Sequence, residues 1–249
     1  MIKKAMILAA GLGSRLLPYT ENKPKALVEL HGVQLIDFQI KKLIAGGFTH
    51  ILINVHHLAD MLCEHIHKSR FDAGIEFSDE RDKLLDTGGA VKKAAWFFRD
   101  VSNFLVINVD VITNLDLHSF MQKHQESNAL STIAVRDRIT NRYLLFDENG
   151  SLCGWRNIKT GEERMIKPNN KQRPMAFSGI HCMSSKIFRV FPAQETFSII
   201  DAYLGLAAKH QIKAFPHQED FWADAGKAAE FNKLNKDREV GKVIKLYNR

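Results

Sequence analysis

The sequence predicts an α/β protein with a mainly parallel sheet flanked by helices. Short apolar runs rich in β-branched residues recur through the first half, and segments of helix length separate them. Alternation of this kind is typical of βαβ units with buried parallel strands. The chain of 249 residues, 45% hydrophobic, is also long enough to bury a substantial core. The expected strands are Lys4–Ala9, His50–Val55, Gly74–Ser78 and Asn103–Asp110, and the expected helices are Leu35–Ala45, Leu58–Lys68 and Gly88–Phe98.

The pattern of expected elements changes after about Ser127, where short extended runs replace the alternation of strands and helices. The turn Glu148–Ser151 predicts a hairpin, and the polar, turn-rich stretch Asn157–Met175 predicts a flexible loop. The second half therefore adds a small extended and hairpin portion. Its expected strands are Leu130–Val135, Arg142–Phe146, Ala176–Met183 and Ile212–Pro216, and its expected helices are Phe197–His210 and a tail from Lys227.

Composition narrows the functional classes. The formal charge is +7, but the Lys and Arg residues are scattered and no RNP, KH or zinc-finger pattern is visible, so we expect no nucleic-acid partner. No apolar run approaches the roughly 20 residues of a membrane span, and the N-terminus lacks the features of a signal peptide, so we expect a cytoplasmic protein with no membrane partner. Three scattered cysteines and the adjacent His56 and His57 predict neither a disulfide framework nor a zinc site.

The loop after the first expected strand carries glycines and cations. Gly11 and Gly13 allow backbone amides to point at a phosphate, and Arg15, Lys23 and Lys25 add positive charge. The loop lacks the third glycine of GxGxxG, and the P-loop pattern GxxxxGK[ST] is absent. A tight turn with solvated cations remains the alternative for the glycines alone.

The whole stretch "AAGLGSRLLPYTENKPKAL" resembles the signature GxGxRxxPxTxxxPK of the sugar-1-phosphate nucleotidyltransferases. Its fixed positions are occupied by Gly11, Gly13, Arg15, Pro18, Thr20, Pro24 and Lys25. The resemblance implies a Rossmann-like nucleotide-diphospho-sugar transferase fold and transfer from a nucleoside triphosphate to a sugar 1-phosphate. It also implies that Ala10, Gly11, Gly13, Arg15 and Lys25 bind the nucleotide, with Arg15 and Lys25 catalytic.

Two aspartates are the candidate metal ligands. Asp110 ends an apolar strand, which is where open α/β sheets build their sites, although a lone aspartate there is often a turn or cap residue. Asp224 lies in "FWADAGK", which resembles the family segment WxDxGT, and Val109 replaces the glycine of the family's "GD". The resemblance implies Mg²⁺ held by both carboxylates, and Asn108 is expected to contact substrate.

Two further segments are candidate base and sugar contacts. "DTGGA" opens an expected helix and resembles the family's base-binding turn, so Thr87, Gly88 and Gly89 are expected to contact the nucleotide, with helix capping as the alternative. "FSGI" resembles a strand of N-acetylmuramate-1-phosphate uridylyltransferases and mannose-1-phosphate guanylyltransferases, which implies that Ser178 and Gly179 face the sugar.

We therefore expect one nucleotidyltransferase domain over residues 1–249, with a nucleotide-binding half at about 1–126 and a sugar-binding half at about 127–249. The expected partners are UTP, GTP or CTP and a sugar 1-phosphate. The loop motif also resembles phosphocholine cytidylyltransferases, and a non-catalytic nucleotide-binding regulatory protein is a further alternative. The base, the sugar and the oligomeric state stay open.

Overall fold

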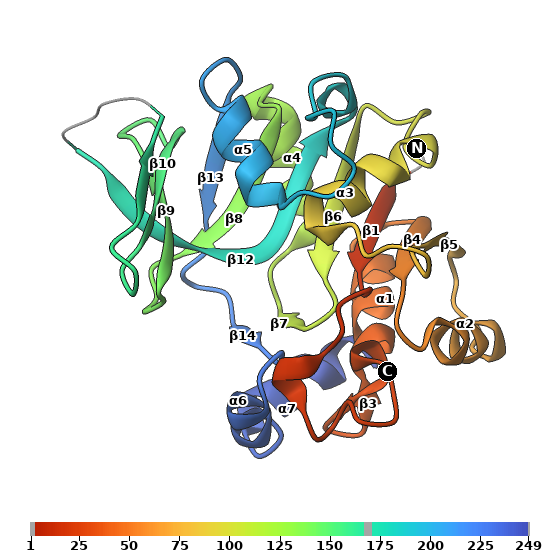
Figure 1. Ribbon diagram of the computed structural model, residues 1–249. Helices are drawn as coiled ribbons and strands as arrows, with labels where there is room; N and C mark the ends of the chain where they lie inside the picture. The colour runs from red at the N-terminus through yellow and green to blue at the C-terminus, as the bar shows by residue number, and fades with distance from the viewer. Residues whose placement is uncertain (1–2, 167–170, 249) are drawn as a thin grey trace. The chain divides into compact units, whose positions relative to one another are not determined.

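The chain divides into two units, each assembled from segments that are distant in the sequence (Figure 1). This computed structural model describes residues 3–166 and 171–248. The first unit comprises Met1–Leu84, Val106–His118 and Asp220–Arg249, and the second comprises Leu85–Leu105 and Ser119–Glu219. The chain thus passes between the units four times. The expected division at residues 126 and 127 falls inside the second unit, and the assignment of nucleotide and sugar binding to two halves stays a prediction.

The first unit is built on parallel strands, as the alternating pattern predicts. Strand β1 (Lys4–Leu8) pairs in parallel with β4 (His50–Val55), which pairs in parallel with β5 (Gly74–Asp79). Strand β6 (Asn103–Asn108) neighbours β1 on the other side and contributes its last three residues to this unit. Helices α1 (Leu35–Ala45) and α2 (Ala59–Lys68) separate the strands in the chain. The interior of β1 and β4 is fully buried, which explains their continuous apolar runs.

Two short two-stranded sheets complete this unit. Strand β7 (Val111–Thr113) pairs with β14 (Trp222–Asp224), and β2 (Glu29–Leu30) pairs with β3 (Val33–Gln34). Both pairs are antiparallel. The 3₁₀ turns η1 (Ser14–Leu16) and η2 (Lys25–Leu27) lie on either side of the segment 17–24 of the glycine loop, which contains both of its prolines.

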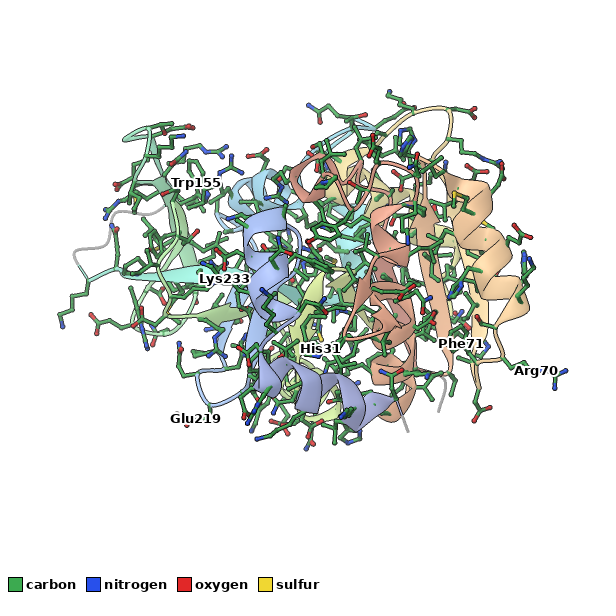
Figure 2. The ribbon with its side chains drawn as sticks, turned by 90° about the horizontal axis from the view of Figure 1, so that it is seen from below. His31, Arg70, Phe71, Trp155, Glu219 and Lys233 are labelled. Atoms are coloured by element: carbon green, nitrogen blue, oxygen red, sulfur yellow. The ribbon has the colours of Figure 1, made fainter. Side chains whose placement is uncertain are left out.

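The expected helical tail is two helices, α6 (Ala228–Leu234) and α7 (Arg238–Tyr247). The break comes at Asp237, whose side chain accepts a hydrogen bond from the Glu239 amide and caps α7. The ring of Tyr247 on α7 lies edge-on to Phe38 of α1, with centroids 5.7 Å apart. Figure 2 shows His31 beside these helices, and the His31 Nε2 atom lies 2.8 Å from the Leu234 carbonyl oxygen of α6.

The second unit is mostly antiparallel. Its strands run in the order β11-β10-β9-β12, and β8 pairs with both β12 and β13. The hairpin predicted from the turn at Glu148–Ser151 is confirmed, because β9 and β10 pair antiparallel across it. The elements of this part are α3 (Asp86–Lys93), η3 (Ala94–Trp96), α4 (Leu117–Ser127, which begins in the first unit), β8 (Ser131–Arg136), β9 (Arg142–Phe146), β10 (Leu152–Asn157), β11 (Glu163–Met165), β12 (Arg173–Ser184), η4 (Ser185–Arg189), α5 (Ile199–Leu206) and β13 (Ile212–Pro216).

The prediction of a flexible loop over Asn157–Met175 is wrong at both of its described ends. Residues Glu163–Met165 form β11 against the edge of β10, and β12 already begins at Arg173. All three side chains of β11 are exposed, so the strand has no apolar alternation that a sequence pattern could detect. Gly154 of β10 permits the pairing, because a Cβ there would lie 2.8 Å from the Met165 Sδ atom. Residues 167–170 lie outside the described part of the chain.

Over the described ranges 3–166 and 171–248, the helices include none that is both long and apolar enough to cross a membrane.

Candidate active site

The glycine loop begins where β1 ends, and a buried asparagine fixes its first residues. Asn54 on β4 accepts hydrogen bonds through Oδ1 from the amides of Ala9 at 2.7 Å and Ala10 at 3.3 Å. Its Nδ2 donates to Glu80 Oε1 at 2.8 Å, and both side chains are buried. The amide of Ala10 therefore already has a protein partner. Sequence reasoning assigned no role to Asn54 or to Glu80.

Gly13 is required by the shape of the loop itself. Its φ of +71° lies in the left-handed region, and a Cβ there would lie 2.9 Å from the Thr20 Cγ2 atom and 3.3 Å from the Lys25 Cβ atom. Thr20 is buried and donates from Oγ1 to the Gly13 carbonyl at 2.9 Å. The signature glycine, threonine and lysine are thus in mutual contact, and the turn delivers Lys25.

Gly11 and Arg15 are the open part of this loop. Nothing lies within 4 Å of the position that a Cβ of Gly11 would take, so no neighbouring atom of the described protein requires a glycine there. Arg15 lies on η1 and is exposed, and within residues 3–166 and 171–248 its guanidinium has no hydrogen-bond or ion-pair partner. The loop therefore presents the exposed guanidinium of Arg15 together with backbone at Gly11 that no neighbouring described side chain covers.

The two candidate metal ligands meet because β7 pairs with β14 (Figure 1). Val111 is opposite Asp224 in this pair, and the Ala225 amide donates to the Asp110 carbonyl at 2.9 Å. These contacts bring together two side chains that are 114 positions apart in the sequence by their numbers. Lys25 Nζ forms an ion pair with Asp110 Oδ2, and both side chains are about nine-tenths buried, with 12% and 10% exposed.

Gly226 marks the point on which these groups converge. A Cβ at Gly226 would lie closer than 3.0 Å to Asp110 Oδ2, Asp224 Oδ1 and Lys25 Nζ. The Gly226 amide donates to Asp224 Oδ1 at 2.8 Å. Only a residue without a side chain therefore leaves room for two carboxylates and an ammonium group at one place.

The electrostatics of the carboxylates favour a cation. Burial raises the pKa of Asp224, and the neighbouring Asp110 carboxylate raises that pKa further, while the Gly226 amide and Lys25 act in the opposite direction. A buried and a partly buried carboxylate in contact repel each other when both are ionised, and a divalent cation between them would reduce that repulsion. Within the described residues, no group of three or more His, Cys, Asp or Glu side chains is arranged to hold a metal ion.

The two residues just before Asp110, Asn108 and Val109, differ in their exposure to solvent. Asn108 is the last residue of β6 and is partly exposed. Val109 is buried, with 2% of it exposed, and its amide donates to the Leu8 carbonyl at 3.1 Å. The β-branched side chain that replaces the family glycine thus lies in the protein interior and leaves little surface for a substrate to meet.

The candidate base-binding turn belongs to the second unit, where its residues pack on the segment 195–199. The amides of Gly88 and Gly89 both donate to the Phe197 carbonyl, at 2.9 and 3.2 Å, and Thr87 Oγ1 accepts from the Ile199 amide at 3.0 Å. A Cβ at Gly88 would collide with the Phe197 ring, and one at Gly89 would collide with the Glu195 carbonyl oxygen. This packing accounts for both glycines within the protein, and base contact there stays a prediction.

The candidate sugar contacts also lie in the second unit. Gly179 has a φ of +76° at a register shift between β12 and β8, which explains a glycine at this position. Ser178 is fully buried, and its Oγ lies 2.8 Å from His217 Nε2. Ser178 thus has an internal partner, and contact with sugar at either residue stays a prediction.

Comparisons with known proteins agree with the fold. The chain belongs to the family described as Nucleotidyl transferase, whose model matches residues 4–240. The α/β architecture with a mainly parallel core is the nucleotide-diphospho-sugar transferase fold that the sequence predicts.

Three curated relatives are similar in sequence to this chain. An N-acetylmuramate alpha-1-phosphate uridylyltransferase of Caulobacter vibrioides is 42% identical over 114 residues, covering 44% of this chain and 46% of the relative. A UTP--glucose-1-phosphate uridylyltransferase of Synechocystis sp. is 26% identical, covering 92% of this chain and 61% of the relative. A mannose-1-phosphate guanyltransferase of Hypocrea jecorina is 26% identical, with shares of 92% and 62%. The alignments thus span about half to three-fifths of these relatives' lengths.

Solved structures show the same fold. HddC from Yersinia pseudotuberculosis has a TM-score of 0.75 at 24% identity, covering 94% of this chain and 99% of its own. The inositol-1-phosphate CTP transferase from T. maritima has a TM-score of 0.76 at 15% identity, with shares of 100% and 97%.

Proposed function

We propose that this protein transfers a nucleotidyl group from a nucleoside triphosphate to a hexose 1-phosphate in a Mg²⁺-dependent reaction. The products would be a nucleoside diphosphate sugar and pyrophosphate, which makes the reaction a step of nucleotide-sugar biosynthesis. The observation that carries the proposal is the convergence of Asp110, Asp224 and Lys25 on Gly226, in contact with the glycine loop through Gly13. An anionic phosphate centre and its counterion require this combination of cation and carboxylates.

The reaction joins two anions, so charge neutralisation and alignment supply most of the catalysis. An oxygen of the sugar phosphate would attack the α-phosphorus, and the bond from that phosphorus to the bridging oxygen of the pyrophosphate would break. Lys25 would bind the phosphates at the reacting centre, and Arg15, exposed on η1, would hold the triphosphate. Bound Mg²⁺ would supply Lewis-acid stabilisation of the phosphate oxygens, with Asp110 and Asp224 as its protein ligands.

The glycine loop suits the triphosphate. The space next to Gly11 is free of protein atoms, and Gly13 holds the turn in its left-handed conformation. Backbone amides at such a turn form an anion-binding concavity. In this proposal the backbone of Ala10 lies close to the triphosphate, while the Ala10 amide keeps its hydrogen bond to Asn54 Oδ1.

The substrates are proposed from the relatives' names and from the "FSGI" segment. We favour a sugar 1-phosphate of the N-acetylmuramate or mannose type, with UTP or GTP as the donor and CTP as the remaining possibility. Thr87, Gly88 and Gly89 would contact the base, and Asn108, Ser178 and Gly179 the sugar. An N-acetylmuramate substrate would connect the enzyme with the cell wall. Because nucleoside triphosphates and sugar phosphates are cytoplasmic metabolites, we infer a cytoplasmic location.

A matrix of nucleoside triphosphates against sugar 1-phosphates and phosphocholine, read by release of pyrophosphate with and without Mg²⁺, tests the proposal. We expect release with one sugar phosphate and one or two nucleotides, and none without the metal. Asp110→Asn should lower turnover by at least about 100-fold with an unchanged melting temperature, since it removes one charge and one metal-binding oxygen.

Release with phosphocholine alone would favour the cytidylyltransferase alternative. Nucleotide binding without turnover for every pair would favour a regulatory protein. Wild-type turnover in Asp110→Asn would overturn the assigned role of this carboxylate.

A further inference from the structure

Helix α1 carries two polar side chains where an amphipathic helix would present apolar ones. Gln39 is fully buried and Lys42, three positions later on the same face, is 1% exposed. A buried amide or ammonium group is unfavourable unless hydrogen bonds compensate for the lost water. The Gln39 amide nitrogen and the Lys42 ammonium group find those bonds in one segment, residues 109–115, which also contains Asp110. The buried Gln39 Oε1 has no hydrogen-bond partner among the described residues, so the amide is held through its nitrogen alone.

Gln39 bonds to the two peptide carbonyls on either side of Asp110. Its Nε2 donates to the Val109 carbonyl at 3.4 Å and, in a shorter bond, to the Val111 carbonyl. The carbonyl of Asp110 itself accepts from the Ala225 amide at 2.9 Å. Three consecutive carbonyls are thus held, two by α1 and one by the chain that follows β14.

Lys42 holds the same segment further along. Its Nζ donates to the Leu115 carbonyl at 2.8 Å and lies 3.1 Å from the Tyr247 hydroxyl of α7. Helix α1 therefore contacts the backbone on both sides of β7. Since β7 pairs with β14, this support also extends to the strand that carries Asp224.

We propose that Gln39 is a positioning residue that fixes the backbone at Asp110 and so keeps the Asp110 carboxylate opposite Asp224 in a geometry suited to a divalent cation. The inference rests on the proposed function. Among the described residues, Gln39 makes no hydrogen bond to either carboxylate, and it acts through the peptide groups that flank Asp110. A displacement of about 1 Å at a reacting centre can lower a rate roughly 100-fold, so support of this kind has a measurable effect.

Gln39→Met tests the inference, because methionine keeps the length and approximate volume of glutamine but cannot donate to the two carbonyls. We expect faster hydrogen exchange at the Ala225 amide without metal, and a dissociation constant for Mn²⁺ raised about tenfold or more in calorimetric titration. Turnover should fall, with a smaller change in KM for the nucleoside triphosphate.

Phe38→Leu is the matched control. Phe38 is the neighbouring residue on α1, is also buried, and its ring packs on that of Tyr247. It has no amide or other polar side-chain group that could bond to the peptide groups beside Asp110. This variant should melt at a lower temperature and keep wild-type Mn²⁺ affinity and Ala225 exchange. If Gln39→Met does not fold, Gln39→Asn, which keeps the amide but is too short to span the same distance, should show the same two changes.

A folded Gln39 variant with wild-type exchange at Ala225 and wild-type Mn²⁺ affinity would overturn the inference. Failure of the proposed function looks different: the wild-type protein would bind no Mn²⁺, or Asp110→Asn would bind it equally well. The exchange measurement needs no metal, so it reports on the role of Gln39 in either case.

Discussion

Gly226 is the residue on which the candidate site depends most directly. Its missing side chain leaves the space that Asp110, Asp224 and Lys25 occupy together. Its conformation is not a left-handed one, so the requirement for glycine comes from these neighbours and not from the backbone. The glycine at the end of the "DAG" motif is therefore explained by the close packing of three charged side chains around it.

Gly226→Ala should abolish or strongly reduce turnover, by about 100-fold or more, because the added methyl group would separate the three charged groups. Pyrophosphate release and Mn²⁺ titration measure the effect. Gly205→Ala is the control, since a Cβ at this exposed position of α5 would meet nothing within 4 Å and should leave turnover unchanged. Wild-type metal affinity in Gly226→Ala would show that the carboxylates do not need the space.

Asn54 illustrates a residue whose importance appears only in three dimensions. Its side chain connects the first two amides of the glycine loop to Glu80, across two neighbouring strands. Each buried polar group in this chain of contacts has a partner, which is the condition under which such groups persist in a core. In the sequence it was one amide among apolar residues, with no feature that linked it to the loop.

At the scale of elements, short contacts decide which residues meet. The three-residue pair β7 and β14 joins Asp110 to Asp224, and the start of α3 packs against residues 195–199. The "TGG" segment was expected to approach a base, and the structure shows that its backbone already approaches Phe197 within the second unit. The same freedom of glycine serves protein packing here.

Gly89→Ala should lower the melting temperature by several degrees, because its Cβ would overlap the Glu195 carbonyl and overpacking of this kind costs about 1–3 kcal/mol. Thermal unfolding followed by circular dichroism measures it, again against Gly205→Ala, which lies in the same unit. An unchanged melting temperature together with a raised KM for the nucleoside triphosphate would instead support base contact at this glycine.

At the scale of the whole molecule, two buried histidines link stability to pH. Burial lowers the pKa of His181 to about 3 and that of His124 to about 4, from about 6.5. Each is hydrogen-bonded through Nδ1, to the Tyr203 hydroxyl at 2.6 Å and the Thr132 hydroxyl at 2.8 Å. Below about pH 6.5 the unfolded chain takes up protons that the folded chain does not, so stability is full above that pH and falls as the pH drops towards 4.

We expect the free energy of unfolding to fall by up to about 1.4 kcal/mol per pH unit for each histidine between pH 6.5 and 4. Urea unfolding at pH 7.5, 5.5 and 4.5 measures this slope. His181→Gln should reduce the slope, because it removes one of these two buried imidazoles. Equal slopes in the wild-type protein and in His181→Gln would contradict the assignment of a neutral buried imidazole.

Patterns local to the chain predicted most of the fold. The parallel strands and helices of the first 100 residues follow from period and length, and α1 and β4 have the bounds that the sequence predicts. The sequence did not predict strand β11, because its three side chains are all exposed and it is held by pairing with the edge of β10. The loop signature likewise predicted the family, because its residue types recur at fixed spacing over a short stretch of chain, and Gly13 and Thr20 of this stretch are hydrogen-bonded to each other.

The sequence by itself determined the α/β class, the family and the identity of the acids and cations, since each depends on residue type and short spacing. Only the tertiary structure decided that Asp110 and Asp224 meet, that Gln39 bonds to the peptide groups beside Asp110, that Asn54 bonds to the start of the glycine loop, and that Gly88 and Gly89 pack on the chain near Phe197. These are contacts between residues far apart in the chain. Their geometry depends on strand pairing and burial, which no local pattern records.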